Sequence, residues 1–418
     1  MSTKKLVVPS KISPTLCIVL CLILFLHVTA SENQDVPGHL VKRDERQSII
    51  STEFGEVLGA NVYDGNETFR LQFITLEPNS LFLPVLLHQD MVFYVHTGSG
   101  KLVSYRDEYK KENVSLKQGD VYRLETGTVF FLQSDLELDL ARQKFRICAI
   151  FGNAGEALRQ PTAYGPYSSI RDLVLGFDKK ILKETFKVPS EVMEEITSGM
   201  KPEAIMHGLP RITKRSISAY SSFDTINKDK KKSNLFNIFH EKRDFKNCNG
   251  WSTTVNQKKY SAFKDSKYGL FMVNLTNGGM MGPHWNPMAT EISIVLHGKG
   301  MVRIICPSLP NQQTECKNTR FEVEEGDVFV VPRFHPVVQM AFNNETFVFM
   351  GFGTSTKNNH PQYLAGKASV LRALDKHILA ASFGVNDTTF DKLLNKQDSV
   401  RLPVFYCGKT SLLLGVLQ

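Results

Sequence analysis

The segment ATEISIVLHGKG, residues 289–300, decides the fold, because the same pattern occurs 200 residues earlier as MVFYVHTGSG, residues 91–100. In both copies a run rich in β-branched or aromatic residues ends in a Gly-x-Gly turn. A Gly-Asp turn then follows in each half, at residues 119–120 and 326–327. Short runs of this kind, separated by glycine turns, are typical of antiparallel β-barrels. The repeat therefore predicts two β-barrels in one chain.

A helical segment follows each strand-rich region. Residues 178–182 and 375–379 both begin with Asp-Lys and have apolar residues at helical spacing, at a constant offset of 197 residues. Each segment leads to a second helix start, Pro189-Ser190-Glu191 in one half and Asn386-Asp387-Thr388 in the other. We expect a helical extension after each barrel.

The chain divides into six parts. They are a signal peptide (1–30), a flexible N-terminal segment (31–52), an N-terminal barrel with its helical tail (53–207), a basic linker (208–250), a C-terminal barrel with its helical tail (251–400) and a C-terminal tail (401–418). The linker contains Lys214-Arg215 and the lysine cluster 228–232, which predict a solvated and protease-accessible segment. A peptide released from this segment is the alternative interpretation.

The first thirty residues have the features of a secretory signal. Three lysines precede the apolar run Leu16–Leu26, and Ala30 offers a small residue at the cleavage site. A membrane anchor is the competing interpretation, but a bilayer span needs about 20 apolar residues. The sequence predicts entry into the secretory pathway, and no membrane partner once the signal has been removed.

Charge and composition exclude other classes of protein. The net charge is +8, but the basic residues are dispersed and no aromatic-interleaved basic platform accompanies them. We therefore expect no nucleic-acid partner. An apolar content of 42% and a charged content of 22% are those of a globular chain with a buried core.

Five cysteines remain after signal removal, so at least one thiol stays free or pairs between chains. Cys306 and Cys316 bracket a short loop, and an oxidising lumen would permit a disulfide bond between them. Sequons for N-linked glycosylation provide five acceptor candidates: Asn66, Asn113, Asn274, Asn344 and Asn386.

The strongest similarity to a known family lies in residues 278–298 and 326–337. The first stretch begins at Gly278, contains His284 and Glu291, and ends in the glycine turn at Gly298. In this order it resembles the first sequence motif of the cupin superfamily. The second stretch resembles the second cupin motif. Together with Gly351-Phe352-Gly353, these strings resemble the C-terminal cupin of plant vicilins, and the likeness extends from about Glu53 to Lys396.

The resemblance implies a mainly β fold with two cupin (double-stranded β-helix, jelly-roll) barrels, each followed by a helical extension. It also implies a homotrimer assembled through the helical extensions, and a nutrient reservoir deposited in the protein storage vacuole of seeds, with the extracellular space as the alternative destination. The chain departs from many vicilins in lacking a long Glu/Gln/Arg-rich N-terminal extension and in its number of cysteines.

Cupin enzymes hold a metal ion with several histidines and a carboxylate inside the barrel. In the N-terminal half, the offset of 200 places Pro84, Leu86 and Met91 at the ligand positions, and Phe130 stands where the last histidine would be. These four side chains cannot replace a ligand set of three histidines and a carboxylate. We therefore expect no cofactor in this barrel.

The C-terminal half retains part of a ligand set. His284 and Glu291 occupy ligand positions, but Asn286 replaces the second histidine and Val337 the last one. His335 lies two residues before Val337 and, on a strand, would face the same side. The sequence predicts a degenerate site of His284, Glu291 and His335. This site either binds a transition metal weakly or is a cluster of hydrogen-bonded polar side chains without a metal.

No catalytic residues are predicted, because no nucleophile, acid or base pair accompanies this partial ligand set. The predicted function is non-enzymatic seed storage of the vicilin type. The alternative is a vicilin-like protein that binds a metal ion or a small sugar in the C-terminal barrel. A metal-dependent oxidase resembling germins is the third hypothesis, and the lost ligands oppose it.

Overall fold

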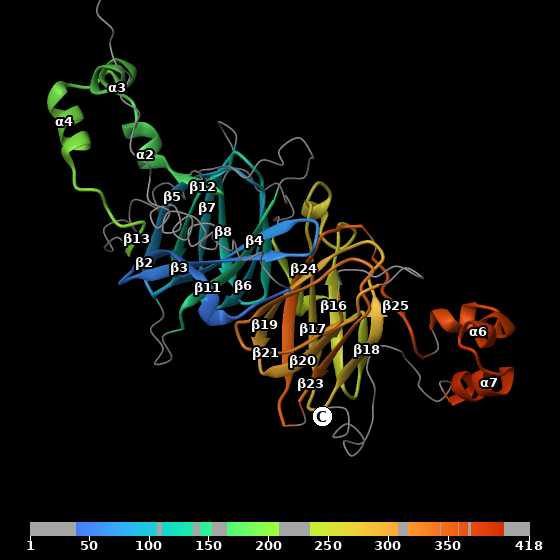
Figure 1. Cartoon of the computed structure of the whole chain (residues 1–418). Coiled ribbons are helices and arrows are strands. Elements are labelled where there is room, and N and C mark those ends of the chain that lie inside the picture. Colours follow the sequence, from blue (N-terminus) through green and yellow to red (C-terminus); the bar gives the residue numbers. More distant parts are fainter. Residues whose placement is uncertain are drawn as a thin grey trace, which may run out of the picture.

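The computed structural model describes residues 39–106, 111–136, 143–152, 165–208, 235–307, 317–342, 344–357, 359–366 and 369–396. The predicted signal peptide (1–30) and C-terminal tail (401–418) lie outside these ranges. Four antiparallel sheets form two barrels side by side, each with its own helical extension (Figure 1).

The N-terminal barrel consists of two sheets. Its inner sheet has the order β14 (Phe236–Asn237), β9 (Asp120–Leu124), β6 (Met91–Thr97), β11 (Phe145–Phe151), β4 (Thr68–Leu76), β3 (Gly55–Tyr63) and β2 (Gln47–Thr52). Its outer sheet has the order β12 (Tyr167–Ser169), β5 (Ser80–Leu87), β10 (Val129–Ser134), β7 (Ser99–Tyr105) and β8 (Lys111–Lys117), with β13 (Ile205–His207) also paired to β5.

The C-terminal barrel repeats this plan. Its inner sheet has the order β1 (Leu40–Val41), β22 (Val328–Val331), β19 (Glu291–His297), β24 (Phe347–Gly353), β17 (Gly269–Leu275), β16 (Gly250–Val255) and β15 (Phe245–Asn247). Its outer sheet has the order β21 (Thr319–Glu324), β20 (Lys299–Ile304), β23 (Val337–Ala341), β18 (Met280–Trp285) and β25 (Gln362–Tyr363). The predicted duplicated barrel is confirmed, and β6 and β19 begin 200 residues apart, at Met91 and Glu291.

Successive side chains along the strands of the inner sheets are apolar on both faces. One set fills the interior of the barrel, and the other set forms a second apolar face on its outside. On β19, Val295 points into the C-terminal barrel, while Ile292 and Ile294 belong to a separate core. That core, which we call the shared core, also contains Phe69 and Leu71 from β4 of the other barrel. A strand directs successive side chains to opposite faces. One face of each inner sheet therefore lines the interior of its own barrel, and the other face packs in the shared core between the barrels.

The two barrels exchange their edge strands. β1 precedes the N-terminal barrel in the chain but pairs with β22 of the C-terminal barrel, with Leu40 opposite Phe329. Conversely, β14 precedes the C-terminal barrel but pairs with β9 of the N-terminal one, with Phe236 opposite Val121. We call this arrangement the reciprocal strand exchange.

A buried aspartate holds each exchanged segment. The carboxylate of Asp327 accepts hydrogen bonds from the backbone N–H of Arg43 at 3.1 Å and from the Lys42 ammonium at 2.8 Å. In the other half, the Asp120 carboxylate accepts a hydrogen bond from the Asn237 side-chain amide at 2.8 Å. These are the aspartates of the two Gly-Asp turns that the sequence repeats.

The exchange corrects two predicted boundaries. Within the expected flexible segment 31–52, residues 40–52 form β1, the 3-10 helix η1 (Arg43–Glu45) and β2. Within the expected linker 208–250, residues 236–250 form β14, η3 (Ile238–His240), β15 and the start of β16. Within these segments, β2 and β15 form hairpins with β3 and β16, whereas the two-residue strands β1 and β14 pair only with strands far away in the sequence.

The helical extensions follow the repeat. The first contains α2 (Ile170–Leu175), α3 (Lys179–Phe186) and α4 (Ser190–Ser198), and the second contains α6 (Lys376–Ser382) and α7 (Asp387–Lys396). Asp178 caps α3 by accepting from the N–H of Ile181, and Asp375 caps α6 by accepting from the N–H of His377 and Ile378. The described residues also include the 3-10 helices η4 (Ser261–Phe263) and η5 (Val370–Ala373).

Cysteines divide into two kinds. Cys148 is a free, buried thiol in the shared core, which agrees with the expectation that at least one cysteine is unpaired. Cys248 and Cys306 are disulfide-bonded. Cys316 lies outside the described residues, so the pairing of Cys306 with Cys316 stays a prediction.

Candidate polar site in the C-terminal barrel

Inside the C-terminal barrel, polar side chains gather at one end of an otherwise apolar core. They come from four strands and lie on the faces that point inward: His284, Glu291, Ser293, Gln339 and Tyr363, which we call the barrel polar cluster. Val337, from the same core, pairs in register with His284 across β18 and β23. A valine therefore stands directly opposite the histidine, as the sequence predicts.

His284 is fully buried and in one defined protonation state. Its Nδ1 lies 2.8 Å from the carbonyl oxygen of Gly282, so Nδ1 carries the proton and donates it to that oxygen. Burial lowers the pKa of His284 to about 4, because charging an imidazole away from water is unfavourable. The ring is neutral, and its Nε2 lone pair has no hydrogen-bond partner.

Glu291 has the opposite tendency. Burial raises the pKa of the Glu291 carboxyl to about 7, and a contact with the Asn286 side chain opposes part of that increase. The Asn286 Oδ1 in turn accepts a hydrogen bond of 2.7 Å from the Asn359 amide. Asn286, which replaces a ligand histidine, is thus part of an amide network.

Tyr363 joins the two ionisable groups. Its ring centroid lies 5.2 Å from that of His284, and its backbone pairs with His284 between β25 and β18. Burial and the nearby charge of Glu291 both raise the pKa of Tyr363. Its hydroxyl has no hydrogen-bond partner, and neither do the Gln339 carbonyl oxygen and the Ser293 hydroxyl, although all three atoms are buried.

His335 does not join this cluster, which corrects its expected position. It lies in a turn between β22 and β23, where its N–H donates to the Pro332 carbonyl, and its Nδ1 is 3.1 Å from the Arg333 carbonyl oxygen. The parity argument fails because Pro332 and Pro336 flank a turn and not a strand. Its nearest ionisable neighbours include His39, whose pKa is lowered by burial and by His335.

The predicted three-ligand metal site is therefore absent as a group. Over the described parts of the chain, no three His, Cys, Asp or Glu side chains are arranged to hold a metal ion. What remains is a neutral imidazole, a carboxyl that gains a proton readily, and unpaired amide and hydroxyl groups. Such a set can hydrogen-bond a small polar molecule or water, and it offers a transition metal one nitrogen ligand and one oxygen ligand.

In the described part of the N-terminal barrel, the cluster has only a small counterpart, in which the Tyr167 hydroxyl donates a hydrogen bond of 2.8 Å to the buried Gln72 side chain. Met91 and Phe93 occupy the positions of Glu291 and Ser293, and both are buried in a hydrocarbon core. Phe130 is fully buried, and its ring centroid lies 6.2 Å from that of Phe82. Pro84 and Leu86 lie on β5, which pairs with β10. The described lining of this barrel fits packing and not ligand binding.

The five glycosylation candidates lie in different settings. Asn66, Asn113, Asn344 and Asn386 are exposed, and Asn113 lies on the outer strand β8. Asn274 is partly buried near the end of β17, which lies between β16 and β24. The Asn386 Oδ1 accepts a hydrogen bond from the N–H of Thr389 and so caps α7.

Sequence comparison connects this geometry to known proteins. The family model described as "Cupin" matches residues 236–391, which cover the C-terminal barrel and its helices. A vicilin-like seed storage protein of Arabidopsis thaliana is 44% identical over 94% of this chain, and the chain spans 58% of the length of that relative. A second Arabidopsis vicilin-like seed storage protein is 42% identical over 88% of this chain and 75% of its own length.

Solved structures show the same fold. Vicilin from Capsicum annuum superimposes with a TM-score of 0.75 at 21% identity, covering 89% of this chain and 100% of that chain. A vicilin from Solanum melongena, described as having different anionic ligands in structurally similar pockets, gives 0.74 at 23% identity over 91% of this chain and 100% of that one. This chain belongs to the vicilin-like seed storage proteins, a family of plant proteins built from cupin barrels.

Proposed function

We propose that this protein is a seed storage globulin, a nutrient reservoir that accumulates in the protein storage vacuole and catalyses no reaction. The observation that carries the proposal is the similarity to two vicilin-like seed storage proteins along most of the chain. The two barrel interiors support it, because the described lining of one is mostly hydrocarbon with a hydrogen-bonded Tyr167–Gln72 pair, and the other keeps His284 without a second histidine. Storage requires only a stable, compact chain that is later degraded.

Abundance tests this proposal directly. Quantitative proteomics of maturing seeds, germinating seedlings and leaves should show that the protein accumulates during seed filling and disappears after germination. A protein that is scarce in seeds and constant in leaves would contradict storage. Immunogold labelling of the same seeds should place the protein in storage vacuoles and not in the cell wall.

We further propose that the protein forms a homotrimer through its helical extensions. Leu182 of α3 and Leu379 of α6 are buried within their own extensions, but the apolar Ile181 and Ile378 beside them are 49% and 68% exposed. Phe186 and Phe383 are exposed at the ends of the same helices. The two extensions lie at opposite ends of the molecule (Figure 1).

This arrangement favours a closed ring. An apolar face at each end allows the first extension of one copy to contact the second extension of the next, and head-to-tail contacts of this kind form a ring where the rotation between copies closes. Burial of an exposed isoleucine or phenylalanine contributes about 1.5–3 kcal/mol. The number three comes from the resemblance to vicilins.

Light scattering coupled to size-exclusion chromatography tests the trimer. The wild-type protein should elute with about three times the mass of one chain, and Ile378→Glu should reduce it to one chain, because a charge would be buried in the contact. Met288→Glu is the matched control, since Met288 is 51% exposed outside the helices. A monomeric wild-type protein, or a trimeric Ile378→Glu variant, would refute this contact.

Ligand binding in the C-terminal barrel is the second candidate function, which the family comparison favours less than storage. The observation in its support is the set of buried atoms without partners, the His284 Nε2, Tyr363 hydroxyl and Gln339 Oε1. Elemental analysis and native mass spectrometry of protein purified from seeds should find less than one metal ion or small molecule per chain if storage is the function. Stoichiometric occupancy that is lost in His284→Gln would favour binding.

Over the described parts of the chain, every helix is too short or too polar to cross a lipid bilayer.

A further inference from the structure

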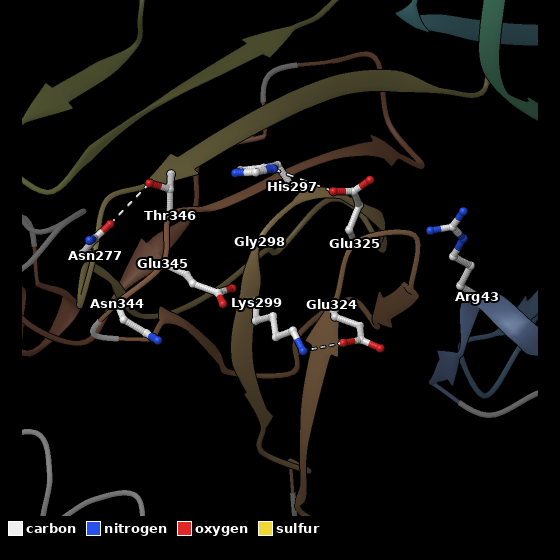
Figure 2. A pocket seen from close by; sticks show the side chains of 10 residues that line it. All are labelled: Arg43, Asn277, His297, Gly298, Lys299, Glu324, Glu325, Asn344, Glu345 and Thr346. Atoms are coloured by element: carbon white, nitrogen blue, oxygen red, sulfur yellow. Dashed lines mark hydrogen bonds and ion pairs between the residues drawn. The ribbon is translucent and has the colours of Figure 1, made fainter. Parts of the chain in front are cut away.

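A polar groove lies on the surface of the C-terminal barrel, where the turn between β19 and β20 meets the chain between β23 and β24 (Figure 2). Its volume is about 810 Å³. Apart from Gly298, every lining residue is polar: Arg43, Asn277, His297, Lys299, Glu324, Glu325, Asn344, Glu345 and Thr346. Among the described residues of the lining there is no Phe, Tyr or Trp.

Three consecutive wall residues form a glycosylation sequon. Asn344, Glu345 and Thr346 all line the groove, and the Asn344 side chain is exposed. Figure 2 places Asn344 at one end of the groove and Arg43 at the other. The wall is closely packed here, because a Cβ atom at Gly298, where φ is +77°, would lie 1.7 Å from the Thr346 carbonyl oxygen.

The groove carries charges of both signs, with the carboxylates of Glu324, Glu325 and Glu345 and the cations of Arg43 and Lys299. The Lys299 ammonium lies 2.8 Å from the Glu324 carboxylate, and the His297 Nδ1 lies 3.7 Å from the Glu325 carboxylate. Thr346 donates a hydrogen bond of 3.3 Å to the Asn277 side-chain oxygen. A surface that alternates donors and acceptors without a dominant charge suits a neutral ligand whose hydroxyls both donate and accept.

We propose that Asn344 carries an N-linked glycan and that the first sugars of this glycan lie in the groove, extending toward Arg43. In the modification, the Asn344 Nδ2 forms a bond to C1 of a lipid-pyrophosphate-linked oligosaccharide, the bond from C1 to the pyrophosphate oxygen breaks, and Nδ2 loses one proton. Both substrates meet in the secretory lumen, so the inference depends on the proposed secretory route but not on storage.

The covalent link to Asn344 explains how a groove with only weak contacts could hold the first sugars of the glycan. An open polar groove without an aromatic platform exchanges hydrogen bonds to water for hydrogen bonds to sugar, with little net gain for a free ligand. A glycan attached at Asn344 is held beside the groove at an effective concentration of roughly millimolar or more, as for other short tethers. Weak contacts are then enough to hold its first residues in place.

The glycan would also cover the site of strand exchange. Arg43 belongs to η1, directly after β1, and its backbone N–H binds Asp327 beside the groove. Sugars in this position contact the exchanged segment and the barrel that receives it. The exposed sequon residue Asn113, in contrast, lies on the outer strand β8, in a sheet that contains neither exchanged strand.

Site mapping and glycan-release kinetics test the proposal together. The chain should be secreted from a eukaryotic host behind a host signal peptide, so that the route does not depend on the natural one. Peptide mapping after enzymatic deglycosylation in ¹⁸O-water should mark Asn344 as modified. Endoglycosidase should release the Asn344 glycan from folded protein at least tenfold more slowly than from urea-unfolded protein.

Two variants separate the groove from general folding. Lys299→Ala/Glu324→Ala should bring the release rate from folded protein close to the unfolded rate, because both side chains are exposed and contact the proposed position of the sugars. Lys246→Ala/Glu322→Ala removes one charge of each sign outside the groove and should leave the rate unchanged. An unmodified Asn344 in secreted, folded protein would refute glycosylation at this site. Equal rates of glycan release from folded and unfolded wild-type protein would refute the position of the sugars in the groove.

A free-sugar titration distinguishes an attached glycan from a soluble ligand. The Asn344→Gln protein, titrated with N,N′-diacetylchitobiose, should show no saturation below millimolar concentrations. Saturation at micromolar concentrations would contradict the need for a covalent link and would indicate a sugar-binding site instead.

Discussion

The imidazole of His284 and the carboxyl of Glu291 respond to pH in opposite directions. Burial lowers the pKa of His284 from 6.5 to about 4, so the unfolded chain binds more protons than the folded one in that window. Stability from this group is present above about pH 6.5 and is lost as the pH falls. Burial raises the pKa of Glu291 from 4.5 to about 7, so its stabilising contribution is present below about pH 4.5 and is lost as the pH rises.

Because the two windows overlap, each group masks the other in the wild-type protein. We predict that Glu291→Gln makes the melting temperature fall as the pH decreases from 6.5 to 4, and that His284→Gln makes it fall as the pH rises from 4.5 to 7. Each effect corresponds to roughly 3 kcal/mol, at about 1.4 kcal/mol per pKa unit. Thermal unfolding over this pH range measures both.

The double variant His284→Gln/Glu291→Gln is the control, since its melting temperature should change little with pH in either direction. If both single variants keep the pH profile of the wild type, the two groups are not held in the protonation states that their burial implies.

Motif spacing identified His284 and Glu291, but not the residues that complete their surroundings. Tyr363 contacts His284 through the pairing of β25 with β18, a long-range contact that leaves no local pattern in the sequence. Gln339 could have been found, because it lies two residues after Val337 on the same strand and therefore faces the same interior. His335 was misplaced because the two prolines beside it were not weighed against strand parity.

At the scale of the element, the exchanged strands depend on single buried carboxylates. The Asp327 side chain is 1% exposed and, besides Lys42 and Arg43, accepts a hydrogen bond from the Glu324 N–H at 3.0 Å. One side chain thus joins β1, the start of η1 and the turn before β22. Hydrogen bonds to a charged group contribute more than those between neutral groups.

We predict that Asp327→Ala lowers the free energy of unfolding by roughly 2–4 kcal/mol, because two backbone N–H groups and the partly exposed Lys42 ammonium lose their buried acceptor. Thermal and urea unfolding of the full chain measure the loss. The matched control is Glu322→Ala on the neighbouring strand β21, whose side chain is exposed. Equal stability of Asp327→Ala and the control would show that this carboxylate does not hold the exchanged strand.

The elements that sequence predicts best are those with a local signal. The helices that follow Asp178 and Asp375 and the strands that begin at Met91 and Glu291 were predicted from the repeat, and the structure places them there. β1 and β14 were missed because each is two residues long and forms only against a strand of the other half.

At the scale of the whole molecule, the repeat predicts two barrels but not the apolar face between them. The shared core takes Phe69 and Tyr94 from one half, and Leu270 and Met350 from the other. In the sequence, these residues alternate with those of the barrel interiors, so the strands read as continuous apolar runs. Such runs indicate burial on both faces, but not the identity of the partner.

We predict that neither half is stable alone, because each would expose the shared core and lack one edge strand. Residues 31–208 and 235–418, produced separately, should be insoluble or bind a hydrophobic dye, while co-expression should yield a 1:1 complex with the melting temperature of the intact chain. Circular dichroism and light scattering provide the readouts. Separate halves that are monomeric and melt cooperatively at the wild-type temperature would contradict this prediction.

The reciprocal strand exchange has a consequence for synthesis on the ribosome. The N-terminal barrel cannot close the edge beside β9 until Phe236 has emerged, and β1 must wait even longer for β22. At roughly 5–20 residues per second, these delays last from several seconds to about a minute. Throughout that time the nascent chain presents an unpaired strand edge, which invites pairing with neighbouring chains. A cell that makes this protein in bulk therefore needs enough lumenal chaperones to cover the unpaired strand edges of all the chains that are being translated.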